Sequence, residues 1–149
     1  MAAERQGLEQ EWLLLQQQCE EYERYSLLIK LFNFLLFSVF LLAGGLAGKT
    51  GMVVLVVLLM VWLQDAIWKT FQSRIVPRLL QLEQAIHPLN VGAHVQPDTT
   101  AFQFNTHYMQ SRPSQIGLIR EYATQAIRPT VAFPHALLVF MACVLIVLG

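Results

Sequence analysis

Charge is the scarcest feature of this sequence. Charged residues make up 13% of its 149 residues, against about 25% in a typical soluble domain. Ten basic and ten acidic residues cancel, so the formal net charge is zero. A chain without excess positive charge has no electrostatic attraction for phosphate backbones, and we predict no nucleic-acid partner. Hydrophobic residues make up 55% of the chain. This balance excludes an ordinary soluble domain and predicts an integral membrane protein in contact with a lipid bilayer.

Motifs for catalysis are also missing. The chain contains no glycine-rich phosphate loop and no G-x-S-x-G frame around a nucleophilic serine. Its four histidines lie at positions 87, 94, 107 and 135, without the spacing of a metal site. We therefore predict no enzymatic activity, no metal and no cofactor. The two cysteines, Cys19 and Cys143, are expected at very different depths relative to the membrane, which excludes a disulfide between them.

Three apolar segments are long enough to be membrane helices, which need about 20 mostly apolar residues. They cover residues 27–48, 51–68 and 131–149. The short Lys49-Thr50 link between two glycines predicts a tight turn. The first two segments, 27–68 together, are therefore expected to form an antiparallel hairpin, with Asp65 level with Phe34.

Heptad spacing extends beyond this hairpin on both sides. An acidic, amphipathic helix is predicted over 1–26, and a helix over 69–87 that continues the second span. Their apolar stripes are expected to pack together as a cytoplasmic stalk; the residues are Leu8, Trp12, Leu15, Cys19, Tyr22, Ile75, Leu79, Leu82 and Ile86. The predicted fold class is thus an all-α integral membrane protein with three transmembrane helices, the first two forming a hairpin extended into a cytoplasmic helical stalk.

The rest of the predicted cytoplasmic part contains a loop and a helix. Residues 88–113 show no periodicity and are predicted as a long loop, a kind of segment that is usually functional or disordered. Its aromatic residues make it a candidate partner-binding loop; they are Phe102, Phe104 and Tyr108. Residues 114–128 have one apolar face and precede the third span, which predicts an amphipathic helix at the membrane interface.

Polar residues within the spans need partners. Lys30, Asn33 and Asp65 lie near the cytoplasmic end of the hairpin. An isolated carboxylate at that depth would cost several kcal/mol. We therefore predict that Asp65 accepts hydrogen bonds from Asn33 or Lys30, or else meets a cation on another subunit. His135, beside the third span, is interpreted as an interfacial residue; a shared haem would need a ligand from a partner.

Gly44 and Gly48 have the spacing of a small-residue helix interface. They are candidate helix-packing glycines that would let a partner helix approach closely. The alternative is that the glycine-rich stretch merely makes the end of the hairpin compact.

Basic residues predict the orientation of the chain. Most of them lie in or next to the segment 69–129 or just before the first span, and such residues favour the cytoplasmic side. The N-terminus and residues 69–129 are therefore expected in the cytoplasm, and the C-terminus on the opposite side. The acidic region before the first span does not resemble a signal peptide. These features fit a bacterial inner membrane.

The function is predicted from the absence of catalytic and cofactor-binding motifs, the small size of the chain and the aromatic residues of the loop. The leading hypothesis is a small non-catalytic accessory or scaffold subunit of a larger membrane protein complex, which docks other integral membrane subunits through its transmembrane helices and cytoplasmic loop. The alternative is a homo-oligomeric pore-forming or membrane effector protein, although no span carries a full polar stripe. A third hypothesis, a redox or haem subunit, depends on His135 alone.

Overall fold

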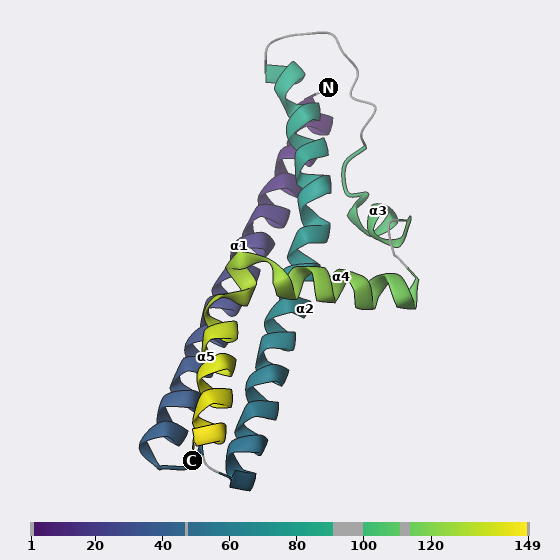
Figure 1. Cartoon of the computed structure of the whole chain (residues 1–149). Coiled ribbons are helices and arrows are strands. Elements are labelled where there is room, and N and C mark those ends of the chain that lie inside the picture. Colours follow the sequence, from purple (N-terminus) through teal and green to yellow (C-terminus); the bar gives the residue numbers. More distant parts are fainter. Residues whose placement is uncertain (1, 47, 91–99, 111–113, 149) are drawn as a thin grey trace. The chain divides into compact units, whose positions relative to one another are not determined.

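The chain is described by a computed structural model that covers residues 2–46, 48–90, 100–110 and 114–148 (Figure 1). All elements in these ranges are α-helices: α1 (Ala2–Leu42), α2 (Gly48–Asn90), α3 (Phe104–Gln110), α4 (Gln115–Ile127) and α5 (Pro129–Leu148). They belong to two compact units. Unit 1 comprises residues 1–22 and 71–114, and unit 2 comprises residues 23–70 and 115–149.

Three helices are long and apolar enough to cross a membrane, namely α1, α2 and α5. This confirms the predicted all-helical fold with three helices that could span a membrane. The first two helices contain 41 and 43 residues. At 1.5 Å per residue each is about 60 Å long, roughly twice the hydrocarbon thickness of a bilayer. Only about half of each helix is therefore needed to cross.

The turn between α1 and α2 lies earlier than the sequence predicted. Helix α1 ends at Leu42 and α2 begins at Gly48, so Lys49 and Thr50 are helical rather than a turn. Backbone bonds from the Gly45 N–H to the Phe40 carbonyl (2.9 Å) and from the Ala43 N–H to the Val39 carbonyl (3.0 Å) close the end of α1. The shorter first helix shifts the register, so that Asp65 meets Ser26 and Lys30 instead of lying level with Phe34.

Glycines take two different roles near this turn. Gly44 and Gly48 have φ values of +66° and +58°, a backbone conformation that residues with a side chain rarely adopt. Beyond the neighbouring residues of the chain, no atom of the described residues lies within 4 Å of a Cβ built on either glycine. Both lie at the turn, and none of the described helices packs against either of them. The close approach is at Gly51, where a Cβ would meet the Leu46 carbonyl oxygen and lie 2.8 Å from Cγ1 of Ile146 on α5.

Gly51→Ala is expected to destabilise unit 2 by about 1–3 kcal/mol, because the added methyl group overpacks a contact with backbone. The thermal unfolding midpoint of the purified protein measures this loss. An unchanged midpoint would show that Gly51 does not lie this close to the Leu46 backbone and to Ile146.

The core of unit 2 joins the three candidate spans. Its buried apolar residues come from α1, the turn, α2 and α5; they are Phe37, Leu46, Val54, Leu58, Leu138 and Ala142. Helix α5 is interrupted at Phe133 (φ −85°, ψ 127°), directly before Pro134, which has no N–H to donate. His135 thus lies in the first turn of the regular part of α5.

Helix α4 belongs to unit 2 and runs crosswise to α5 in Figure 1. Its bounds agree closely with the segment 114–128 that the sequence indicated. The face that it exposes is apolar: Ile116, Ile119 and Ile127 are 81%, 68% and 76% exposed, while Gln125 is buried. An exposed isoleucine face on a helix that leads into a span is typical of an interfacial helix.

Unit 1 has its own core between α1 and α2. Leu8, Leu15 and Cys19 pack against residues of α2, and Trp12, Tyr22 and Ile86 lie at the margin; the α2 residues are Ile75, Leu79, Leu82 and Ala85. The helix α2 is continuous through Pro77. The segment 88–113, predicted as a loop, contains the continuation of α2 to Asn90 and the short helix α3, which the lack of periodicity did not indicate.

Leu15→Asp is expected to disrupt unit 1 while unit 2 stays folded. Leu15 is 5% exposed in the unit 1 core, and an unpaired charge there has no compensating partner. Limited proteolysis should cut the variant within residues 1–22 much faster than the parent chain. Leu14→Asp is the matched control, because Leu14 is 60% exposed. Equal cleavage of both variants would contradict packing through Leu15.

Candidate functional site

A buried polar cluster in unit 2 unites side chains from α1, α2 and α5. Asp65 on α2 is fully buried and is the centre of the cluster. Its Oδ1 accepts a hydrogen bond from Ser26 Oγ at 2.5 Å. Its Oδ2 lies 3.3 Å from the Lys30 ammonium and 3.2 Å from His135 Nε2. The carboxylate is therefore satisfied entirely by groups of this chain.

His135 is held through both of its ring nitrogens. Nε2 faces Asp65, and Nδ1 lies 2.6 Å from the side-chain nitrogen of Asn33 on α1. The ring also stacks on Trp62, with centroids 6.3 Å apart, and the Trp62 indole donates to the Ala126 carbonyl at the end of α4. Since neither nitrogen is left to bind a metal, the geometry does not favour His135 as a haem ligand.

The cluster contains serine, histidine and aspartate, but not in the arrangement of a catalytic triad. A triad needs the serine hydroxyl hydrogen-bonded to the histidine, which acts as its base. Here Ser26 and His135 each bond to Asp65, and the Ser26 hydroxyl donates to the carboxylate. The other group beside the serine hydroxyl is Lys30, whose Nζ donates to it at 3.0 Å while forming the ion pair with Asp65. What the arrangement can do is fix the register of three helices.

The sequence singled out three of the five residues of this cluster. Lys30 and Asp65 form an ion pair, whereas Asn33 contacts His135 instead of Asp65. Ser26 and His135 were not assigned to Asp65. The signal for His135 was present: it is the only histidine in a third span without acidic or basic residues, and such a residue in a span usually has a partner. Ser26 was placed just outside the predicted span.

Among the described residues, one buried side-chain atom has no hydrogen-bond partner. It is Oδ1 of Asn33, whose amide nitrogen engages His135. A buried acceptor of this kind is commonly satisfied by a single water molecule. The charged groups of the cluster are thus all paired, and one acceptor, Asn33 Oδ1, is left for a further hydrogen bond.

A second buried ion pair organises unit 1. Arg78 on α2 and Glu11 on α1 form a bidentate pair, with Nε–Oε1 and Nη2–Oε2 distances of 2.9 and 3.0 Å. Both side chains are at most 5% exposed. Arg78 also donates to the Thr100 carbonyl at 2.9 Å, and the Phe102 N–H donates to Glu11 at 2.5 Å. The pair therefore attaches residues 100–102 to the two helices.

The aromatic residues of the predicted partner-binding loop have different environments. Phe104 packs at the edge of the unit 1 core, and Phe102 is 61% exposed. The side chain of Tyr108 lies outside the described residues. These residues do not form one aromatic surface in the described part of the chain.

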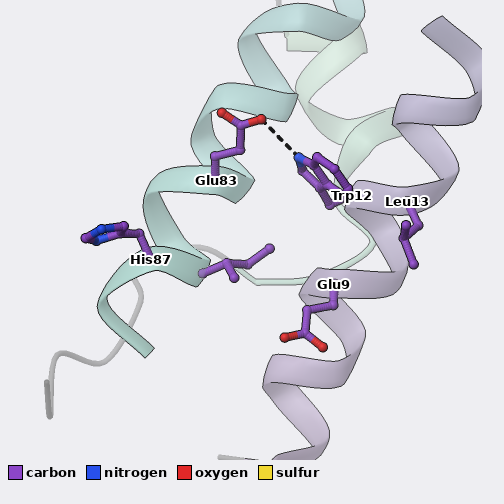
Figure 2. A pocket seen from close by; sticks show the side chains of 6 residues that line it. Glu9, Trp12, Leu13, Glu83 and His87 are labelled. Atoms are coloured by element: carbon purple, nitrogen blue, oxygen red, sulfur yellow. Dashed lines mark hydrogen bonds between the residues drawn. The ribbon is translucent and has the colours of Figure 1, made fainter. Parts of the chain in front are cut away.

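A groove of about 480 Å³ lies between α1 and α2 in unit 1 (Figure 2). Trp12 and Ile86 line it, and the Trp12 indole donates to Glu83 at 3.1 Å. Leu13 and Glu9 lie on the α1 side, and His87 beside Glu83 on the α2 side. The lining is mostly apolar and opens outward, which is typical of a binding surface rather than an enclosed catalytic cavity.

The described residues contain no group of three or more histidine, cysteine, aspartate or glutamate side chains that could hold a metal ion. Comparisons with protein-family models, with curated proteins and with solved structures find no match to this chain.

Proposed function

We propose that this chain is a small, non-catalytic scaffold subunit of a membrane protein complex. The observation that carries the proposal is the open groove of unit 1, on a helix pair that has its own core and its own buried ion pair. The helix pair is held in place by its own core, yet apolar side chains in its groove remain exposed. Uncovered apolar surface outside the bilayer favours docking of another protein.

The buried polar cluster supports this division of roles. Asp65, the costliest group to bury in the spans, is paired within the chain. The spans therefore need no cation from another subunit, and other membrane subunits would contact their apolar outer faces. Recognition of a partner is better assigned to unit 1, where polar and apolar groups alternate on an accessible surface.

The proposed topology places the hairpin across a bacterial inner membrane, with unit 1 forming the cytoplasmic stalk. Residues 69–129 and the N-terminus are then cytoplasmic, and the turn at Gly44 and the end of α5 lie on the opposite side. Helix α4 would lie along the cytoplasmic surface of the bilayer, with its exposed isoleucines against lipid.

A homo-oligomeric pore is less well supported. The buried polar side chains of the described spans gather in one internally bonded cluster. The outward-facing residues of α1 and α2 at membrane depth are mostly apolar, among them Leu35, Val53 and Met60. The exposed polar residues there are isolated: Ser38 bonds to a carbonyl of its own helix, and Gln64 lies next to Asp65. An aqueous channel needs polar groups along its whole length.

Purification from native membranes in a gentle detergent, followed by mass measurement of the intact complex, tests the proposal. We expect a second protein in stoichiometric amount. We expect it to be lost with Leu15→Asp, which disrupts unit 1, and kept with Leu14→Asp. Recovery of the chain alone or as a homo-oligomer would contradict the scaffold function.

A further inference from the structure

Helix α2 carries a second heptad stripe beside the one that packs on α1. The core stripe of unit 1 runs through Ile75, Leu79, Leu82 and Ile86. One residue further along, Val76, Leu80, Glu83 and His87 repeat the same steps of four, three and four. Val76 and Leu80 are 44% and 52% exposed, and Glu83 and His87 are exposed as well. One helix face is therefore covered by α1, while its neighbour is open.

The facing helix presents a matching stripe on the same side of the pair. Glu9, Leu13, Gln16 and Glu20 of α1 have the same spacing. Glu9 and Leu13 line the groove together with Glu83 and His87, which fixes the side to which both stripes belong (Figure 2). The Gln16 amide donates to Glu20 along this stripe at 3.4 Å. The open seam between the stripes extends about 16 Å along α2, or three helical turns.

We propose that this seam binds one basic amphipathic helix of a partner subunit, which completes a three-helix bundle with α1 and α2. This inference rests on the proposed scaffold function and names the partner's chemistry. The length of the seam and its heptad spacing suit a helix, which would bury Leu13, Val76 and Leu80 with its apolar face.

The charged residues along the seam indicate that the partner helix is positively charged. Carboxylates lie on the α1 stripe at both ends, Glu9 and Glu20, and on the α2 stripe at Glu83. Glu9 is paired with Arg5 at 2.8 Å, whereas Glu20 and Glu83 accept hydrogen bonds from the neutral side chains of Gln16 and Trp12, so their negative charge is not neutralised by these contacts. None of the described residues that line the groove is lysine or arginine. Lysine or arginine residues flanking the apolar face of the bound helix would therefore meet opposite charge. A second copy of this seam would instead set carboxylates against carboxylates, which disfavours self-association.

Binding of designed peptides to the full-length protein tests the inference. The probe is a fluorescently labelled peptide of about three heptads, with leucine in its seam and lysine beside it. The control peptide has glutamate in place of each lysine. The protein is held in phosphatidylcholine nanodiscs, and empty nanodiscs give the background. We expect the lysine peptide to bind the protein with a Kd below about 100 μM and the glutamate peptide at least tenfold more weakly.

Two matched substitutions locate the site. Leu80→Ser removes an apolar group from the seam and is expected to weaken binding of the lysine peptide about tenfold. Leu14→Ser removes a leucine that is 60% exposed on α1 but does not line the groove, and should leave Kd within about twofold. Equal binding of both peptides, no binding of either, or equal effects of both substitutions would overturn the inference.

A result that contradicts binding at the seam can be distinguished from one that contradicts the scaffold function. If a stoichiometric partner co-purifies with the parent chain and also with Leu80→Ser, and the lysine peptide does not displace it, the scaffold function stands. The seam is then not where that partner binds.

Discussion

Asp65→Leu is expected to lower the free energy of unfolding of unit 2 by about 3–5 kcal/mol, because the buried groups that contact this carboxylate are left without a partner. Lys30 loses its counter-charge, and Ser26 and His135 lose their acceptor. Chemical or thermal unfolding in detergent micelles measures the loss. Gln64→Leu is the matched control, since Gln64 is the neighbouring polar residue of α2 and is exposed. We expect its effect to be within about 0.5 kcal/mol.

A double-mutant cycle with Lys30→Met tests whether the pair is internal. If Lys30 and Asp65 interact directly, the double variant should be more stable than the sum of the two single losses predicts. The recovery should be partial, because Ser26 and His135 still lack their acceptor. Strict additivity in the isolated chain would contradict a direct Lys30–Asp65 pair.

Arg78→Met is expected to have the second-largest effect, a loss of about 3–5 kcal/mol that is confined to unit 1. The substitution leaves the Glu11 carboxylate buried without its cation and removes the donor to the Thr100 carbonyl. Amide hydrogen exchange measures this loss of stability separately for each segment of the chain. Protection should fall within residues 1–22 and 71–90 and at Phe102, whose N–H is held by Glu11.

The exposed Arg5–Glu9 pair provides the control. Its side chains are 47% and 44% exposed, and exposed pairs contribute about 0–1 kcal/mol. Arg5→Met should therefore leave exchange nearly unchanged. A similar response to Arg5→Met and Arg78→Met would show that the Glu11–Arg78 pair does not hold unit 1 together.

Periodicity and hydropathy predict the helices of this chain well, because both depend on local sequence. The three apolar segments correspond to α1, α2 and α5, and the predicted helix 114–128 corresponds to α4. The short helix α3 was missed, since its seven residues do not establish a period. The turn was misplaced because four glycines lie within residues 44–51, and only the backbone geometry decides which of them end a helix.

The polar sites were predicted less completely, for a related reason. A rule about unpaired charges in spans identifies Asp65 as a residue that needs a partner. The choice of partner depends on the register, which the misplaced turn altered, and on α5, whose approach no local pattern reveals. The buried Glu11–Arg78 pair was missed because a glutamate in an acidic helix usually lies on a solvated face. Only the packing of α2 against α1 distinguishes Glu11 from its exposed neighbours.

Cysteine accessibility in native membranes tests the central claim most directly: that half of α1 and α2 crosses the bilayer and the other half forms a cytoplasmic docking surface. In a chain without Cys19 and Cys143, single cysteines replace Leu14, Thr50 and Leu35; Leu14 is 60% exposed in unit 1 and does not line the groove. A membrane-impermeant maleimide should label Leu14→Cys from the cytoplasmic side only and Thr50→Cys from the opposite side only, and Leu35→Cys from neither. Labelling of Leu14→Cys and Thr50→Cys from the same side would contradict the account.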